Sequence, residues 1–232
     1  MKQSAYAAFL KYIREERRLS QALVAEKALM SRASYVAVEK GTKELTLAEA
    51  AAITKLFGIT LDELLQAKVP DLHIYREMIL GFLRAAANTG HTLKKTKLAH
   101  LLYLADYSWF FLHDTSLSNV IYAKAEFGPL SSSYFQLLEE LEQGGIINVK
   151  QIYRDDYHMY ELTETRASQK KTLDHLNAKQ MAHLTKIWNG WSEASTAEII
   201  QFIKEQLPFK ESVVGEVIAY ELIKGETAHS IY

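Results

Sequence analysis

The chain has 232 residues, of which 48% are hydrophobic and 24% are charged, a composition typical of a folded globular protein rather than a disordered one. Its length suits two domains of moderate size. The absence of cysteine excludes disulfide bonds, a thiolate nucleophile and a cysteine-ligated metal. The first residues lack the apolar core of a signal peptide, and no window approaches the ~20 apolar residues that span a bilayer. We therefore expect a cytoplasmic protein with no membrane partner.

Positive charge is concentrated in the first part of the chain. Residues 1–70 carry 11 Lys and Arg against 8 Asp and Glu, whereas residues 71–232 carry 16 against 20. A weakly basic first segment suits contact with phosphate groups, and an acidic remainder does not.

Residues 1–68 are predicted to form five short helices. Apolar residues recur at helical spacing in the first of them, at positions 6, 9, 10 and 13. Ser20 and Ser31 are suitable N-caps for the next two helices, and Thr46 forms a capping box with Glu49 before the fourth. Glycines suited to helix C-caps and a closing proline complete the pattern: Gly41, Gly58 and Pro70.

Residues 72–225 are predicted to form a second domain of α+β type, so the chain as a whole is mainly α with a small β-hairpin. Helical patterns cover residues 74–87, 97–112 and 133–141, and an extended piece covers 119–129. Alternation and β-branched content predict a hairpin from segments 146–153 and 157–163. Three further helices are expected at about 166–190, 196–206 and 212–224. Residues 226–232 show no periodicity and are expected to form a flexible C-terminal tail.

A set of spaced positions extends through the first domain. They are Leu19, Ser20, Gln21, Val24, Ala25, Ser31, Arg32, Tyr35, Val38, Glu39 and Gly41, followed by Leu47, Ile53, Phe57, Gly58, Ile59, Leu61, Leu64 and Leu65. This pattern resembles the phage-repressor (XRE) type of helix-turn-helix domain. The resemblance implies that residues 31–40 form a recognition helix that enters the major groove of operator DNA.

The resemblance also assigns DNA-contacting residues. It places three residues of the recognition helix against base edges and four others at phosphates, with Ser34 also in the interface. The base-facing residues are Arg32, Ala33 and Ala37, and the phosphate contacts are Gln21, Lys40, Thr42 and Lys43. Only the arginine can make a bidentate contact to guanine. Two alternatives remain: surface alanines on a helix that has lost DNA binding, or a helix reused for protein contact.

Leu29 lies between the two helices of this motif, where the family usually has glycine. A positive φ is favoured at this position. A residue with a Cβ atom adopts it at a cost on the order of 1 kcal/mol in stability. We expect the turn to form at that cost.

A second set of motifs covers much of residues 74–225. It comprises Lys97-Leu98, Leu101-Leu102-Tyr103-Leu104-Ala105-Asp106, Tyr122-Ala123, Phe127-Gly128-Pro129-Leu130, Tyr160-Glu161-Leu162-Thr163-Glu164, Ser195-Thr196-Ala197-Glu198-Ile199-Ile200 and Leu207-Pro208-Phe209. These motifs resemble the Panacea domain of SocA-like antitoxins. The resemblance implies a domain that neutralises a toxin by binding it directly. Members of the family pair with unrelated toxins, so the family does not identify the target.

Aromatic residues crowd the helix expected at 97–112. Burial in a core is the ordinary fate of such a helix, and the alternative is that Trp109 or Phe110 protrudes as a toxin-binding anchor. The histidines at positions 100, 113, 175 and 183 lack the spacing of metal ligands, so we expect solvated or core histidines. No catalytic motif, metal site or cofactor site is predicted.

The leading hypothesis is an antitoxin whose partners are a cognate protein toxin and operator DNA. The first domain would dimerise and repress the protein's own operon, with recognition helices ~34 Å apart. Three alternatives remain: a toxin-free transcriptional regulator whose second domain senses a ligand or protein, an adaptor that delivers a client to a protease, and a metal-dependent nuclease or nucleotide-handling enzyme that the sequence does little to support.

Overall fold

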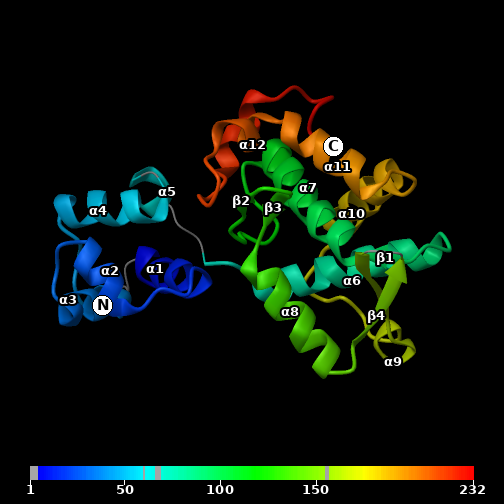
Figure 1. Cartoon of the computed structure of the whole chain (residues 1–232), viewed down its shortest axis with the longest axis horizontal. Coiled ribbons are helices and arrows are strands. Elements are labelled where there is room, and N and C mark those ends of the chain that lie inside the picture. Colours follow the sequence, from blue (N-terminus) through cyan, green and yellow to red (C-terminus); the bar gives the residue numbers. More distant parts are fainter. Residues whose placement is uncertain (1–4, 60, 66–68, 155–156) are drawn as a thin grey trace. The chain divides into compact units, whose positions relative to one another are not determined.

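The computed structural model describes residues 5–59, 61–65, 69–154 and 157–232. The chain divides into two compact units, Met1–Pro70 and Asp71–Tyr232, each with its own core (Figure 1). Within the described residues, no helix is long and apolar enough to cross a membrane.

The first unit contains the five helices expected from the sequence. They are α1 (Ala5–Glu16), α2 (Gln21–Lys27), α3 (Arg32–Glu39), α4 (Leu47–Phe57) and α5 (Leu61–Leu65). Ser20, Ser31 and Thr46 accept backbone hydrogen bonds as N-caps, and Glu49 completes the capping box at Thr46. Gly58 ends α4 with φ at 58°. The apolar faces of the helices meet in a core that includes Leu10, Ile13, Val24, Tyr35, Val38, Ile53 and Phe57.

A buried ion pair joins α1 to α3. The Arg14 guanidinium donates from Nε to Glu39 Oε1 at 2.6 Å and from Nη2 to Oε2 at 3.2 Å. Arg14 also donates to the carbonyl of Leu19, which precedes α2. Burial alone raises the pKa of Glu39, but the hydrogen bonds from Arg14 and Gln21 outweigh it and leave that pKa below its ordinary value. The pair therefore fixes α3, the expected recognition helix, against the first helix of the unit.

The second unit is α+β, which confirms the predicted fold class. Its elements are α6 (Leu72–Asn88), β1 (Leu93–Lys94), α7 (Lys95–His113), β2 (Ala123–Ala125), β3 (Gly128–Leu130), α8 (Ser132–Gln143), β4 (Ile147–Arg154), β5 (Tyr157–Glu164), α9 (Arg166–Gln169), α10 (Ala178–Trp191), α11 (Thr196–Glu205), α12 (Leu207–Glu211) and the 3-10 helix η1 (Tyr220–Gly225). The predicted hairpin is β4–β5, and β1 pairs with β5 to make an antiparallel sheet in the order β1-β5-β4. A second small sheet pairs β2 with β3.

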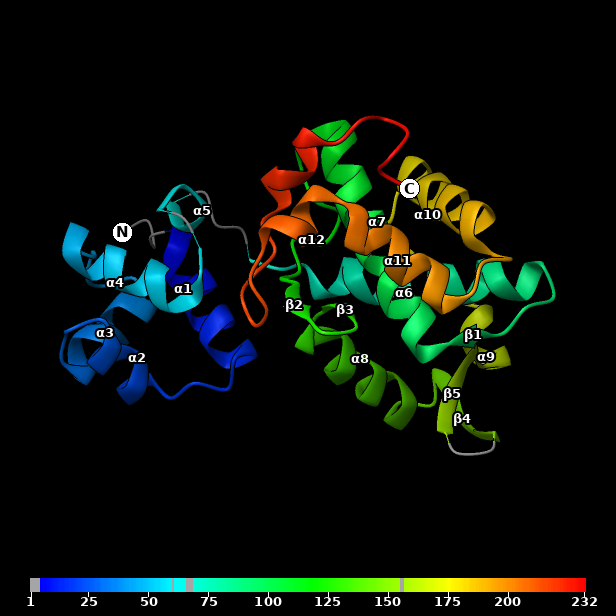
Figure 2. The same cartoon turned by 45° about the horizontal axis from the view of Figure 1, so that its top comes forward.

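Helix α7 forms the centre of the second unit. Every residue from 97 to 109 is buried, and α6, α10, α11 and η1 all pack against this helix (Figures 1 and 2). Its lack of an exposed face agrees with the crowding of large apolar residues in its sequence.

Two of the helices expected in the second unit were wrong. The helix predicted at 166–190 is interrupted over residues 170–177, because Glu77 accepts the backbone N–H groups of Asp174, His175 and Leu176 and holds that segment out of helical geometry. No α-helix spans 212–224, because residues 215 and 216 hydrogen-bond to Lys124 of β2 and only a short 3-10 helix follows.

The last seven residues pack onto the second unit instead of forming a flexible tail. Ile231 is 1% exposed, and the Ser230 carbonyl accepts a hydrogen bond from the side chain of Gln206. The Glu226 carboxylate accepts a hydrogen bond from the backbone of Leu207. Burial of an apolar side chain and these tertiary hydrogen bonds together hold a segment whose sequence lacks periodicity.

Two buried histidines make the second unit sensitive to acid. Burial lowers the pKa of His100 and of His183 to about 4 from the ordinary 6.5. An unfolded chain therefore binds more protons than the folded one between those values, and each histidine costs at most roughly 3 kcal/mol of stability as the pH falls through that window. The first 70 residues contain no histidine.

We expect the unfolding temperature of the second unit to fall between pH 6.5 and pH 4.5, measured by calorimetry. Asp106, whose pKa is raised by burial, acts in the opposite direction in acid, so the contribution of one histidine is isolated by His183→Gln. This variant should lose less stability in acid than the control His229→Gln, which changes an exposed histidine. Equal acid sensitivity of the two variants would contradict the assignment to His183.

Candidate functional site

The two helices of the motif in the first unit are joined by a tight turn. Helix α2 ends at Lys27 with Ala28 as its C-cap, and Leu29 follows with φ at 56°, as its position predicted. Ala25 is 1% exposed where α2 packs against α3, and its carbonyl accepts a hydrogen bond from the backbone of Met30. A small side chain is needed at this crossing because a larger one would separate the two helices.

The recognition helix presents few groups that can form hydrogen bonds with bases. Arg32 and Ala33 are exposed, and Ala37 is half-buried. The Ser34 hydroxyl accepts a hydrogen bond from the N-cap residue Ser31, so it belongs to the cap of α3. Arg32 has no hydrogen bond or ion pair to any described residue and is therefore available for a guanine edge.

The four residues predicted to contact phosphates differ in whether their side chains are already hydrogen-bonded or ion-paired within the first unit. The Lys40 side chain is exposed and has no hydrogen bond or ion pair with any described residue. Gln21 donates to Glu39 at 2.9 Å, and the Thr42 hydroxyl donates to the Ala37 carbonyl at 3.0 Å. Lys43 pairs with Glu49 at 2.6 Å. A phosphate contact from Lys43 would therefore have to replace an existing ion pair, whereas one from Lys40 would not.

In the second unit, the buried carboxylate of Asp106 organises the loop after α7. It accepts hydrogen bonds from Ser116 Oγ at 2.8 Å, Ser118 N at 2.9 Å, Ser118 Oγ at 2.6 Å and Tyr122 Oη at 2.9 Å. Complete burial raises the pKa of Asp106, and the four donors oppose that rise. The loop leads directly into β2, so this carboxylate positions the β2–β3 hairpin.

That hairpin also depends on Gly128, the first residue of β3. A Cβ atom at this position would lie 2.6 Å from Cε1 of the buried His100, and the φ of 119° is itself unfavourable for other residues. The glycine of the Phe-Gly-Pro motif is thus required by close approach to α7. Its neighbour Phe127 is 72% exposed.

The proposed aromatic anchors do not project into solvent. Trp109 is 9% exposed and stacks on His113 at 3.9 Å between ring centroids, with interplanar angle 12°. Phe110 is half-buried, packs against the core and lies 5.5 Å from the Tyr220 ring. Their placement favours the core interpretation of the aromatic crowding on α7.

Exposed apolar groups lie elsewhere on the second unit, and no sequence pattern predicted them. Phe127 occupies the turn of the β2–β3 hairpin, and Val213 and Val214 are 61% and 64% exposed. The segment that follows these valines is joined to β2, because Gly215 N donates to the Lys124 carbonyl and Lys124 N donates to the Glu216 carbonyl. Nearly 90 residues separate the two segments, so periodicity could not reveal their pairing.

Two protein families match this chain. Residues 10–64 match the helix-turn-helix family, and residues 98–208 match the family described as antitoxin SocA-like, Panacea domain. Both matches confirm the resemblances seen in the sequence. These families are typically non-enzymatic. In the part of the chain that the structure describes, no group of three or more His, Asp or Glu side chains could hold a metal ion. No curated protein and no solved structure gave a significant match.

Replacement of Leu29 by glycine should stabilise the first unit by about 1 kcal/mol. Glycine adopts the positive φ without the clash of a Cβ atom, and little packing is lost because Leu29 is 90% exposed. Chemical denaturation of the full chain measures the change. Leu29→Ala is the matched control, since it removes the exposed side chain but retains the Cβ atom, and an equal gain from alanine would show that φ is not the cause.

Proposed function

Because the chain joins a helix-turn-helix domain to a SocA-like Panacea domain, we propose that it is an antitoxin that represses its own operon. The second unit binds and masks a cognate protein toxin, and the first unit dimerises and binds a palindromic operator. The match over residues 98–208 is the observation that carries the proposal. The helix-turn-helix match alone supports a second candidate, a regulator without a toxin whose second unit senses a ligand or protein.

The proposed DNA contacts are assigned to exposed side chains that have no hydrogen-bonding partner among the described residues of the first unit. Arg32 at the start of α3 and Lys40 at its end are both exposed and unpaired among the described residues. The alanines between them offer at most contact with thymine methyl groups. Direct readout is therefore modest, and operator shape and half-site spacing supply the remaining specificity.

We expect Arg32→Ala and Lys40→Gln to have different effects on operator binding. The arginine variant should lose about 1–3 kcal/mol at one base pair and tolerate other bases there. The lysine variant should weaken binding to all sequences. It should also reduce the slope of log affinity against log salt concentration by about one, because one phosphate contact is lost. Lys11→Gln on α1 is the control for general charge, and the readout is DNA affinity across a salt series. If neither variant differs from that control, α3 serves protein contact instead.

The proposed toxin-binding surface includes Phe127. Its ring is exposed, it lies within the segment that matches the antitoxin family, and the β2–β3 hairpin that carries it is anchored to α7 through Gly128 and His100. Large aromatic residues on a rigid element contribute most strongly to protein interfaces. Trp109 is less suitable because it is already buried.

Co-expression of the full chain with each small neighbouring gene tests the antitoxin proposal. One neighbour should arrest growth alone and be neutralised by the wild-type chain. Phe127→Asp should lose this rescue, whereas Leu47→Asp in the first unit should retain it, because Leu47 is similarly exposed at 74%. Rescue by both variants would place the toxin on another surface. Absence of any toxic neighbour would favour the toxin-free regulator.

A further inference from the structure

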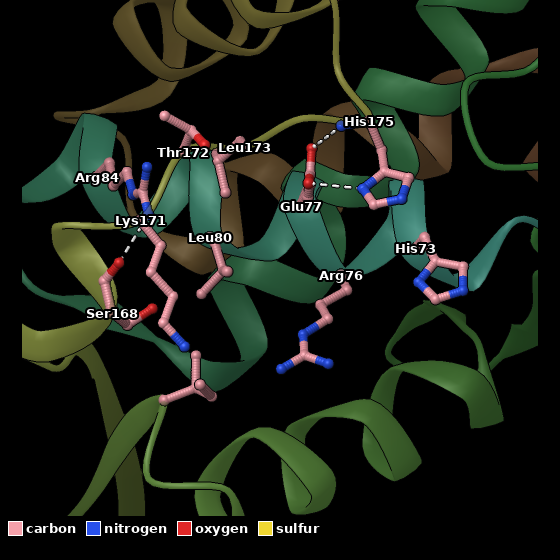
Figure 3. A pocket seen from close by; sticks show the side chains of 11 residues that line it. His73, Arg76, Glu77, Leu80, Arg84, Ser168, Lys171, Thr172, Leu173 and His175 are labelled. Atoms are coloured by element: carbon pink, nitrogen blue, oxygen red, sulfur yellow. Dashed lines mark hydrogen bonds and ion pairs between the residues drawn. The ribbon is translucent and has the colours of Figure 1, made fainter.

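A polar cavity of about 210 Å³ lies on the second unit (Figure 3). One wall is α6, which contributes His73, Arg76, Glu77, Leu80 and Arg84. The opposite wall is the segment from Ser168 to His175, which leaves α9 and leads toward α10. The volume is below the 300–1,000 Å³ usual for drug-sized ligands, so a small group fits best.

Positive charge predominates in this cavity although the unit that contains it is acidic. Arg76, Arg84 and Lys171 line it, and Glu77 is the one carboxylate among the described lining residues. Residues 71–232 as a whole carry more Asp and Glu than Lys and Arg. The overall charge of residues 71–232 therefore does not explain why three cationic side chains line one cavity.

The carboxylate of Glu77 is already saturated. It accepts hydrogen bonds from the backbone N–H groups of Asp174, His175 and Leu176 and from His175 Nδ1, all at 2.8–2.9 Å. These bonds hold the 170–177 segment against α6 and so build the cavity wall. Glu77 thus serves the scaffold, and it forms no ion pair with Arg76 or Lys171.

The three cations have different roles. Arg84 donates from Nε and Nη2 to Glu164 at 2.8 Å each, and Nη2 also reaches the Ser168 carbonyl at 3.2 Å, so this side chain is fixed. The side chains of Arg76 and Lys171 have no hydrogen bond or ion pair with any described residue. Figure 3 shows these two side chains extending into the same opening, on either side of Leu80.

We propose that this cavity binds the phosphate group of a small phosphorylated ligand. Two unpaired cations match the double charge of phosphate, and a guanidinium and an ammonium group supply the directed donors that its oxygens require. The stacked imidazoles of His73 and His175, with centroids 5.1 Å apart, form a further polar edge of the same cavity. The site lies outside the predicted DNA interface and does not depend on the antitoxin proposal.

Calorimetric titration of the full chain at low ionic strength with pyrophosphate tests the site. The wild type should bind, and Arg76→Gln and Lys171→Gln should each weaken binding by about tenfold or more, the loss expected for one charged hydrogen bond. Lys170→Gln is the matched control, since it removes the adjacent exposed lysine that does not line the cavity. Arg32→Ala should leave binding unchanged, which separates this cavity from the DNA-facing surface.

Two results would overturn the proposal. One is no binding of pyrophosphate by the wild type, and the other is equal weakening by Lys170→Gln and Lys171→Gln, which would indicate nonspecific attraction. Titration with a nucleoside diphosphate identifies the source of the phosphate: tighter binding than pyrophosphate indicates a nucleotide, and equal binding indicates an inorganic anion. Loss of toxin rescue in Lys171→Gln without any anion binding would assign the cavity to an acidic side chain of a protein partner instead.

Discussion

A helix without an exposed face has to place its polar groups inside the protein, and the hydrogen bonds that several of them make at α7 organise the second unit. His100 Nδ1 and Tyr103 Oη have no hydrogen-bonding partner among the described residues, but other buried polar side chains of α7 each bind a different part of the chain. Lys97 donates to the carbonyls of Ser192 and Ala194, which precede α11. Asp106 accepts hydrogen bonds from the loop that leads into β2, and Ser108 forms a hydrogen bond with His183 of α10. Segments far apart in sequence thus meet around one helix because unpaired buried polar groups are costly.

The amino-acid sequence is most informative where structure is local. Caps and apolar periodicity predicted all five helices of the first unit, and alternation predicted the β4–β5 hairpin. The errors arose where a distant side chain overrides local preference. Residues 170–177 were expected to continue a helix, but Glu77, nearly a hundred positions earlier, takes up their backbone N–H groups. The docked C-terminal residues depend similarly on Gln206, whose contact no periodicity encodes.

In the candidate sites, too, features of contiguous sequence were predictable, and features formed between distant segments were not. The location of the recognition helix and the positive φ at Leu29 were predictable, because both belong to a motif of contiguous residues. Which side chains are already engaged was not predictable: Gln21 is bound to Glu39, and Lys43 is bound to Glu49. The cation-lined cavity was invisible in the sequence, since it forms only when α6 meets the segment after α9.

The hydrogen bonds of α7 have a consequence for how such a domain can diversify. A substitution at Asp106 or Lys97 would leave groups in several separate segments without partners at once, so those positions tolerate change poorly. The exposed apolar side chains of Phe127, Val213 and Val214 make no such hydrogen bonds. Change can therefore accumulate at these surfaces while the interior stays constant, and a single scaffold can acquire new binding partners without refolding.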